Sequence, residues 1–589
     1  MKRRVIISCL CYALTAFSPV AAWQSALFQS EQGTWVCRPD ADGFILPDFS
    51  HAGYHGADAD LPIVPTVMTI SPISGDNTAH IQAAIDSVGV LPLDATGHRG
   101  ALLLKAGRYP VSGTIKVPYN GVVLRGEGDE EDGTVIYATG DTPHQRDVVV
   151  IGNSTKRVWG ASEKDGTRQD ITDPVVPTGR DIITVADASA YHVGDEIIIF
   201  HPCTSAWLTA VNQGGVPYPD PSAPEEADER WSEGDYPITY HRYIRHIDAN
   251  RLTLDAPVFY TLNRSLSQAY IYIPNMSGTY TESAIEDIRI EIESAGGTDE
   301  NHAWQAVRFR SIENAWAKGC TFVGFGQSGI ITEACRRSTF RDCQALDPVG
   351  IVTGERMYNF NTYLHTQLCL FQDCYARNGR HHYISNGTST TSGNVFLHCV
   401  SDGVQNANEG HRAWTQGMLY DGHQEVNLCR QFVLGLYNRV AMGTGHGWSA
   451  VHSVLWNCDV DEDYGTIGLQ KPPTAQNYAI GCHAKKITGK PVSASDFPIG
   501  YVEGQNTDGL EPASLYLAQL LQRHNLDTPT AAPETADFPR VVSLYTMDGR
   551  LLAQWTENNA AQQISLSMHG CYILRYTTPN KTVIKKQIL

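Results

Sequence analysis

The chain has 589 residues, a formal net charge of −19 at pH 7 and 42% hydrophobic residues, a composition typical of a globular protein with one large domain and smaller additions. Such an acidic chain lacks the basic surface that general nucleic-acid binding needs, so the charge argues against that class. An acidic polymer is still a feasible ligand if the chain builds a local basic cleft, because a cleft concentrates its field on the ligand.

Residues 1–22 have the features of a cleaved secretory signal. Lys2, Arg3 and Arg4 precede a short apolar run that ends in Val-Ala-Ala. We therefore expect an exported protein that begins near residue 23. Later segments do not approach about 18 apolar residues in a row, so we expect no membrane-spanning helix.

Residues 76–88 predict a short amphipathic helix with Asp76 or Thr78 as its N-cap. Its apolar stripe consists of Ile81, Ala84, Ile85 and Val88. The strand-like runs GALLLKAGRYPV and GVVLRGEG follow. A helix in this place would cover the open end of a repetitive β-structure.

Residues 141–275 predict a β-rich insertion, with strand-like runs around GDEI and RLTL. Within it, residues 211–237 are rich in proline, glycine and acids. A loop of this length in a compact domain is usually functional or mobile, so we expect it to border a cleft.

Cysteines recur at a period typical of a solenoid. The windows are TFRDCQA at Cys343, LFQDCYA at Cys374, VFLHCVS at Cys399, EVNLCRQ at Cys429, VLWNCDV at Cys458 and YAIGCHA at Cys482, with Cys320 as a looser match. The residue before the cysteine is usually Asp, His, Asn or Gly, types that tolerate a left-handed backbone. Each window therefore predicts a strand, a one-residue corner and a second strand that begins with an inward cysteine.

This repeat predicts an all-β, right-handed parallel β-helix in which equivalent side chains stack about 4.8 Å apart. The cysteines would form an internal column of thiols, since free cysteine is among the most buried residue types. The spacing lacks the paired C-x-x-C pattern of a zinc site, and we expect neither disulfides nor metal.

The C-terminal part changes composition. Residues 511–525 predict a helix that ends a catalytic domain of residues 23–525, and residues 526–540 predict a linker. Residues 541–589 predict a small β-sandwich-like domain with alternating strands. Its GCYILRY and VIKKQIL segments are similar to the type IX secretion sorting domains of Bacteroidetes, which implies export through that machinery, followed by surface attachment or release.

The solenoid resembles the pectate-lyase-like superfamily. The resemblance rests on DNTAHIQAAID, LLLKAGRYPV, LRGEG, PDFSHAGYHG, DENHAW and GTGHGWSAVHSVLWNC, which together span most of residues 40–525. It looks like the secreted bacterial branch associated with uronic-acid polysaccharide lyases. The resemblance implies the fold more firmly than the substrate, because function depends on the site.

The cysteine spacing also predicts a cationic stripe on one face. Arg356, Arg412 and Lys471 each lie thirteen residues after a cysteine of the repeat. The coils between them contribute Arg380, His381, His382, Arg439 and His446. In the pair His381–His382, strand alternation sends one ring inward and the other outward, so the two cannot serve together.

Elimination at a uronate needs a cation for the carboxylate, a base for the C5 proton and an acid for the leaving oxygen. We expect His382 or His411 as the base and Tyr358 or Tyr383 as the acid. Arginine binds carboxylates with a two-pronged fork. The expected carboxylate and substrate contacts are Arg356, Arg380, Arg412, Arg439, His446, Trp448 and Lys471.

Three alternatives stay open. A calcium-assisted lyase would use acids such as Asp299, Glu300 or those of DVDEDYG, but solvated turns explain these residues as well. A polygalacturonase-like hydrolase would need paired carboxylates on neighbouring strands, which the repeat lacks, although GHG at 445–447 resembles that family's histidine motif. A non-catalytic adhesin would need an exposed aromatic platform, for which Trp304, Trp414 and Trp448 are candidates.

The sequence thus predicts a secreted or cell-surface polysaccharide lyase without a cofactor, acting as a monomer on an acidic polysaccharide. Several cations could accommodate sulfates, which favours a glycosaminoglycan such as chondroitin sulfate or hyaluronan over pectin or pectate. The sequence does not distinguish endo from exo cleavage.

Overall fold

The computed structural model describes residues 22–217, 230–527, 540–546, 551–557, 571–578 and 581–588. The predicted signal, residues 218–229 of the long loop and most of the predicted linker lie outside these ranges. The chain divides into two compact units, Met1–His524 and Asn525–Leu589. Among the described residues, the helices are too short or too polar to cross a membrane.

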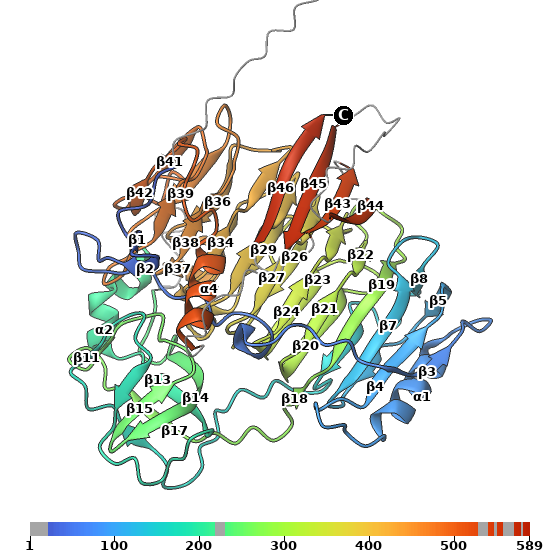
Figure 1. The fold of residues 1–589 in the computed structure, drawn as a ribbon, viewed down its shortest axis with the longest axis horizontal. Helices are drawn as coiled ribbons and strands as arrows, with labels where there is room; N and C mark the ends of the chain where they lie inside the picture. The colour runs from blue at the N-terminus through green and yellow to red at the C-terminus, as the bar shows by residue number, and fades with distance from the viewer. Residues whose placement is uncertain are drawn as a thin grey trace, which may run out of the picture. The chain divides into compact units, whose positions relative to one another are not determined.

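The first unit is a parallel β-helix, as predicted (Figure 1). Its coils pair in parallel from one rung to the next, so Phe340, Phe371 and Phe396 are register partners on successive strands. Three ladders of strands run along it, and β19 (Ala284–Ile292) contributes to two of them.

The first ladder contains β3 (Thr66–Ile70), β4 (Gly100–Leu104), β7 (Val122–Gly128), β19, β21 (Trp316–Lys318), β24 (Thr339–Arg341), β27 (Leu370–Gln372), β30 (Val395–Leu397), β34 (Leu419–Asp421), β38 (Val454–Trp456), β40 (Tyr478–Ile480) and β42 (Tyr501–Glu503). The second contains β5 (Gly107–Val111), β8 (Thr134–Ala138), β19, β22 (Thr321–Val323), β25 (Gln344–Leu346), β28 (Tyr375–Arg377), β31 (Val400–Asp402) and β35 (Gln424–Val426).

The third ladder carries the candidate site. It contains β6 (Ile115–Val117), β9 (Asp147–Gly152), β20 (Gln305–Glu313), β23 (Ser328–Arg336), β26 (Tyr358–Thr362), β29 (His381–Ser385), β32 (Asn408–Gly410), β36 (Phe432–Leu436), β39 (Thr466–Leu469) and β41 (Lys486–Thr488), with β18 (Tyr280–Thr281) beside β20.

The cysteine column and its corners are present. The corner residues before the cysteines have positive φ, for example 55° at Asp342, 54° at Asp373 and 64° at Gly481. The described cysteines are free thiols, and the sulfur of Cys374 lies 3.4 Å from the Phe340 carbonyl of the preceding coil. Burial raises the pKa of the Cys374 thiol well above its usual value, so it is a protonated core residue.

One rung of the predicted column is wrong. Cys429 is exposed and lies after β35, where Asn427 forms the corner with φ 51°. The rung between Cys399 and Cys458 instead has its corner at Gly422, with φ 61°, and the next residue, His423, is fully buried in the column position. The coil pairings, β30 with β34 and β31 with β35, fix this register.

The helix α1 (Thr78–Gly89) covers the first coils, and its predicted apolar stripe is buried. Its N-cap is Asn77 rather than Asp76 or Thr78. Asp76 instead accepts from the Thr78 amide and from the Ser112 hydroxyl, which ties the helix start to a neighbouring loop.

The segment outside the β-helix starts after β9, later than the predicted residue 141, because β9 pairs with β6 and β20 inside the β-helix. A six-stranded sheet forms its body, and α2 (Ser205–Ala210) packs beside it. The strands are β10 (Gln169–Asp170), β17 (Tyr270–Tyr272), β13 (Glu196–His201), β14 (Ile238–Asp248), β15 (Arg251–Leu254) and β12 (Ile182–Thr184), with β11 (Val175–Val176) and β16 (Leu262–Asn263) as a separate pair.

The first unit ends within α4 (Leu515–Asp527), which lies next to the hairpin of β1 (Phe28–Glu31) and β2 (Thr34–Cys37). The described strands of the second unit form one antiparallel sheet, ordered β44-β43-β45-β46, rather than two layers. These strands are β43 (Arg540–Thr546), β44 (Leu551–Glu557), β45 (Cys571–Thr578) and β46 (Lys581–Ile588).

Candidate functional site

The alternation of side chains is interrupted at the start of β29, between His381 and the two residues that follow it. Tyr358 pairs with His381 and Phe360 with Tyr383, so one residue of each strand is skipped between these pairs. The amides of His382 and Tyr383 both donate to the side-chain oxygen of Asn408, at 2.7 and 2.8 Å. His382 and Tyr383 consequently both turn inward, and His381 lies on the outer side beside Tyr358.

Six side chains from four neighbouring coils form what we call the histidine cluster. They are Tyr358, His381, Glu409, His411, Arg439 and His446. The His411 ring is at the centre, with ring centroids 4.9 Å from His381, 5.5 Å from Tyr358 and 5.2 Å from His446. Parallel strands thus gather residues that are far apart in the sequence.

Glu409 holds the His411 ring. Its Oε1 lies 2.8 Å from His411 Nδ1 and 3.2 Å from Arg439 Nε, and its Oε2 accepts from the Tyr437 hydroxyl at 2.6 Å. A carboxylate offers only acceptors, so we assign the proton in this pair to Nδ1 and the lone pair to Nε2, although Arg439 Nη1, also a donor, lies 2.7 Å from Nδ1 and 3.0 Å from Nε2. His411 Nε2 lies 3.4 Å from the Tyr358 hydroxyl.

The cluster is buried, and this sets its protonation. Burial, followed by Arg439, lowers the pKa of His411 well below its usual value, so the ring is neutral at pH 7. Burial and then Arg439 and Arg412 lower the pKa of His446 to about 3. Burial raises the pKa of Tyr358 although Arg380 opposes it, so the phenol keeps its proton.

Two half-buried arginines, Arg380 and Arg412, border the cluster. Arg380 Nη1 lies 3.3 Å from the Tyr358 hydroxyl, and both arginines contribute to lowering the pKa of His411. Among the described residues, neither forms an ion pair with a carboxylate. Because Arg439 already neutralises Glu409, the rim of the cluster has an excess of positive charge.

Two predicted catalytic residues lie elsewhere. His382 Nδ1 lies 2.8 Å from the Ser401 hydroxyl, and its Nε2 accepts from the Gly379 amide at 2.8 Å. Burial lowers the pKa of His382 to about 3, and its inward ring bonds to Ser401 and Gly379 instead of facing the histidine cluster. The Tyr383 hydroxyl donates to core carbonyls and its ring stacks on Phe360, so it cannot reach a substrate.

Most of the predicted cationic stripe is engaged in other contacts. Arg356 forms a two-pronged ion pair with Glu300, and Lys471 Nζ lies 2.6 Å from Asp42. Only Arg412 of the three residues thirteen after a cysteine joins the cluster. The coils differ in length, so equal spacing does not give equal position.

The tryptophans expected on an aromatic platform are buried, with exposed fractions of 9%, 0% and 1% at Trp304, Trp414 and Trp448. Trp448 packs on Phe497, and its amide donates to the Gly214 carbonyl at the start of the long loop. None of the three therefore offers an exposed ring, so the adhesin alternative loses its main feature, and the substrate contact at Trp448 stays a prediction. The described part of the loop also contacts the segment beside His446, because the Trp231 indole donates to the Gly445 carbonyl at 3.1 Å.

Three members of the cluster could offer metal ligands, since atoms of His381, Glu409 and His411 lie within 4.8 Å of one another. However, Arg439 Nη1 lies 2.7 and 3.0 Å from the two ring nitrogens of His411. A divalent cation in this space would be repelled by the guanidinium, so the donor set fits a metal only if Arg439 moves away. The acids considered for calcium have other partners: Asp299 accepts from the Ala295 and Asn301 amides, and Asp461 from the Asp463 amide.

Sequence reasoning missed Glu409 and Tyr437. Glu409 was visible in principle, because residues two apart in a strand share a face and Glu409 precedes His411 by two. Tyr437 follows β36 by one residue, and nothing in the sequence indicates that its hydroxyl reaches Glu409.

No family model matches this sequence, and no curated protein matches it either. Among solved structures, similar chains include the tailspike gp49 of Pseudomonas phage LKA1, with a TM-score of 0.39 and 12% identity over 69% of this chain and 57% of that one. An alginate lyase from Paenibacillus sp. str. FPU-7 has a TM-score of 0.34 and 9% identity over 76% and 99%. A polygalacturonase from Erwinia carotovora ssp. carotovora has a TM-score of 0.34 and 12% identity over 77% of this chain and 98% of that one.

This chain spans 57% of the LKA1 tailspike and 65% of a second listed neighbour, Geobacillus virus E2 ORF18. Likeness at this level does not identify a function. The fold follows from this chain's own strand pairings, and its chemistry has to be argued from the histidine cluster.

Proposed function

We propose that this protein is a polysaccharide lyase that cleaves a uronic-acid chain by β-elimination at the histidine cluster. The observation that carries the proposal is the geometry of His411: Glu409 holds its Nδ1, and its Nε2 lies 3.4 Å from the hydroxyl of Tyr358 and 3.0 Å from Arg439 Nη1. The histidine is neutral and the tyrosine protonated, which are the states that a base and an acid need before reaction.

In the proposed reaction, His411 Nε2 takes the proton from C5 of the uronate. The electron pair of the C5–H bond forms the C4–C5 double bond, the C4–O bond breaks, and the leaving oxygen takes the proton of Tyr358. The proton on His411 then returns to Tyr358 across their 3.4 Å contact. Glu409 orients the imidazole and stabilises its charged form in between.

The uronate carboxylate is assigned to Arg380 and Arg412. Elimination builds negative charge on this carboxylate, and guanidinium groups can hold it with two parallel hydrogen bonds. The two arginines are the half-buried cations at the rim, whereas Arg439 is committed to Glu409. We propose a metal-free reaction, since the guanidinium groups supply the charge that an ion would otherwise provide.

Within the class of acidic polysaccharides, we favour a glycosaminoglycan such as chondroitin sulfate or hyaluronan, because a cation outside the cluster, the exposed Lys156, could accommodate a sulfate. Pectin or pectate is the nearer alternative. We further propose that the protein is exported and acts at the cell surface or after release. A hydrolase is less well supported, since it needs two carboxylates and the cluster contains only Glu409, which is held by Arg439.

The deciding experiment incubates the protein with a panel of uronic-acid polymers, with and without a chelator. Ultraviolet absorbance follows the unsaturated product, and a reducing-end assay follows hydrolysis. We expect absorbance to rise on at least one polymer and to be insensitive to the chelator. Reducing ends without absorbance would replace the lyase by a hydrolase, and loss of activity with the chelator would establish a metal requirement.

Arg412→Ala tests the placement of the site. We expect its turnover to fall by about 100-fold or more, since it removes a cation that stabilises the transition state. Lys471→Ala is the matched control, because Lys471 was a candidate on the same predicted stripe but binds Asp42 away from the cluster. Full activity of Arg412→Ala, or an equal loss in both variants, would refute the placement.

A further inference from the structure

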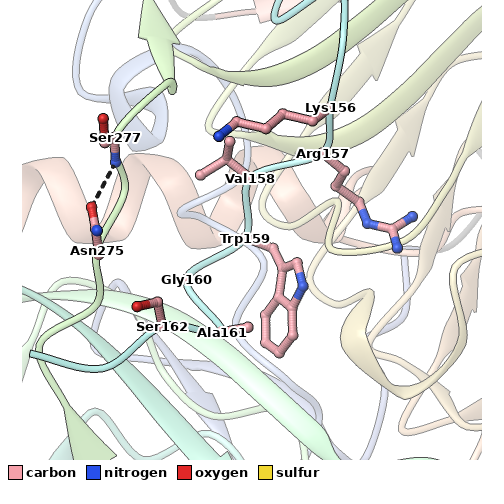
Figure 2. Close-up of a pocket in the computed structure, with 9 residues that line it drawn as sticks. All are labelled: Lys156, Arg157, Val158, Trp159, Gly160, Ala161, Ser162, Asn275 and Ser277. Carbon is pink, nitrogen blue, oxygen red and sulfur yellow. Dashed lines mark hydrogen bonds between the residues drawn. The ribbon is translucent and has the colours of Figure 1, made fainter.

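An open pocket of about 400 Å³ lies where the insertion leaves and re-enters the β-helix (Figure 2). Residues 156–162 form one side of it, and Asn275 and Ser277 line the other side. The pocket contains a tryptophan, two cations and several small polar groups, and the mechanism proposed above does not use them.

The pocket has an excess of positive charge. On its outer side, three arginines share two carboxylates, with Arg157 3.0 Å from Glu333. The arginines are Arg157, Arg308 and Arg310, and the carboxylates are those of Glu333 and Asp147. Lys156 adds a further cation, exposed and without an ion pair within the described ranges of the chain. One guanidinium and one ammonium are therefore available to an anionic ligand.

The aromatic wall of the pocket is already in place. One face of Trp159 stacks on His365, with ring centroids 4.2 Å apart and planes inclined by 6°. The backbone beside it is anchored, because the Val158 amide donates to the Ser311 hydroxyl at 2.7 Å. Trp159 remains half-buried, so part of its ring is available to a ligand.

The pocket and the histidine cluster lie on the same outer face. Backbone hydrogen bonds from Tyr363 to Thr332, from Asn386 to Thr362 and from His411 to Ser385 continue the third ladder past its strand ends. They place Glu333, Tyr363, Asn386 and His411 in one row across adjacent coils. Three strand spacings separate Glu333, the partner of Arg157, from His411, which is roughly 14 Å.

We propose that this pocket is a binding subsite for a negatively charged sugar unit of the same polysaccharide chain that is cleaved at the histidine cluster. This inference rests on the proposed function, and it adds a second place at which the polysaccharide is bound. The row on the outer face would let one extended chain contact the pocket and the cluster together. The pocket would then select chains that carry a carboxylate or sulfate several coils away from the cleaved bond.

The chemistry of the pocket suits such a unit. The apolar face of a sugar ring packs on an aromatic ring, and carboxylates or sulfates of the chain pair with Lys156 and with Arg157, whose side chains extend to opposite sides of the 156–162 segment (Figure 2). Asn275 and Ser277 offer polar groups to sugar hydroxyls from the opposite side. A neutral saccharide would leave the two cations without partners, so the charge provides the selectivity.

The test measures binding by calorimetry in a Tyr358→Phe background, which is intended to prevent turnover. The probes are hyaluronan oligosaccharides, chondroitin sulfate oligosaccharides and a neutral glucan of equal length. We expect Trp159→Ala to weaken binding of the acidic oligosaccharides by about tenfold, as loss of a buried aromatic contact does. Lys156→Ala should weaken it several-fold and reduce its salt dependence. Trp159→Phe should restore most of the affinity, and Lys105→Ala, at an exposed lysine between β4 and β5, is the charge control.

Kinetics with a cleavable polymer separate this inference from the proposed function. On long chains, Trp159→Ala should raise KM with little change in kcat, because the contact is made equally before and during reaction. If the protein cleaves no polymer but binds acidic oligosaccharides through Trp159 and Lys156, the subsite stands and the lyase assignment fails. Unchanged binding and KM in both variants, or equal affinity for the neutral glucan, would overturn the subsite.

Discussion

Tyr358 and Tyr383 form a matched pair of tyrosines that separates catalysis from packing. Both are buried on adjacent strands, with exposed fractions of 1% and 0%. The Tyr358 hydroxyl accepts from the Glu355 amide at 2.9 Å and lies 3.4 Å from His411. The Tyr383 hydroxyl donates to the carbonyls of Cys374 and Val400 at 2.8 and 3.0 Å, inside the core. Replacing each by phenylalanine removes one oxygen and keeps the ring.

The two substitutions should have opposite signatures. Loss of the proposed acid in Tyr358→Phe should lower kcat by about 10²–10⁴-fold, which corresponds to roughly 3–5 kcal/mol of transition-state stabilisation. Its cost in stability should be about 1 kcal/mol, for one lost hydrogen bond. Tyr383→Phe removes the one proton that two buried carbonyls share and should cost about 1–3 kcal/mol of stability, with kcat within about twofold of wild type.

The assay combines initial rates on the most active polymer with denaturant unfolding of both variants. Retention of near wild-type kcat by Tyr358→Phe would remove the tyrosine from the mechanism. Equal losses of kcat in the two variants would show that the losses follow packing of the β-helix rather than proton transfer. Circular dichroism confirms that each variant keeps its strands.

Two predictions concern stability. Burial raises the pKa of Asp421 to about 7, against hydrogen bonds from Ser514 and the Tyr516 amide, so the folded state holds a proton that the unfolded state loses near pH 4. The free energy of unfolding should therefore decrease as the pH rises from about 4 to 7, by at most about 1.4 kcal/mol per pH unit. Denaturation curves recorded across that range should show a smaller slope for Asp421→Asn than for the wild type. An identical slope in the two proteins would contradict the argument. His423→Ala should lower the free energy of unfolding by about 2–4 kcal/mol, because it opens a core cavity and removes the partner 2.9 Å from buried Glu425. Cys429→Ala should change the free energy of unfolding by less than about 0.5 kcal/mol. A larger loss of stability in Cys429→Ala than in His423→Ala would mean that Cys429 occupies the column position.

The repeat was predictable because it depends on local chemistry. A left-handed corner needs Asp, Asn, His or Gly, and an inward position in a narrow core needs a small apolar side chain, so DC, HC, NC and GC pairs mark the rungs. The same logic failed at Cys429. In that rung, Gly422 forms the corner and His423 occupies the column position. Cys429 lies after the next corner, which is formed by Asn427.

The site was only partly predictable, because it depends on an interruption of strand alternation at the start of β29 and on variable coil lengths. Strand alternation correctly indicated that one ring of the His381–His382 pair would turn inward, but not which one. The choice is made by Asn408, whose side-chain oxygen binds two consecutive amides of β29 from the next coil. Nothing within residues 380–383 indicates that contact, so the sequence offers no reason to exclude His382 as the base.

The electrostatics of the cluster lead to one further prediction, about pH. The pKa of His411 is lowered first by burial and then by cations that include Arg380 and Arg412. A substrate carboxylate bound to those arginines would offset their charge and raise the pKa of His411 in the complex, making the imidazole a stronger base when an anionic substrate is present.

This effect should be visible in pH profiles. The base must be deprotonated, so activity rises with pH through its pKa, and kcat/KM reports the free enzyme whereas kcat reports the complex. We expect the acidic limb of kcat to lie at higher pH than that of kcat/KM, and the gap to shrink in Arg380→Ala, where less cationic charge remains to be offset. Coincident limbs in the wild type would mean that the carboxylate binds away from these arginines. In that case the excess positive charge at the rim would serve to attract the polymer rather than to tune its cleavage.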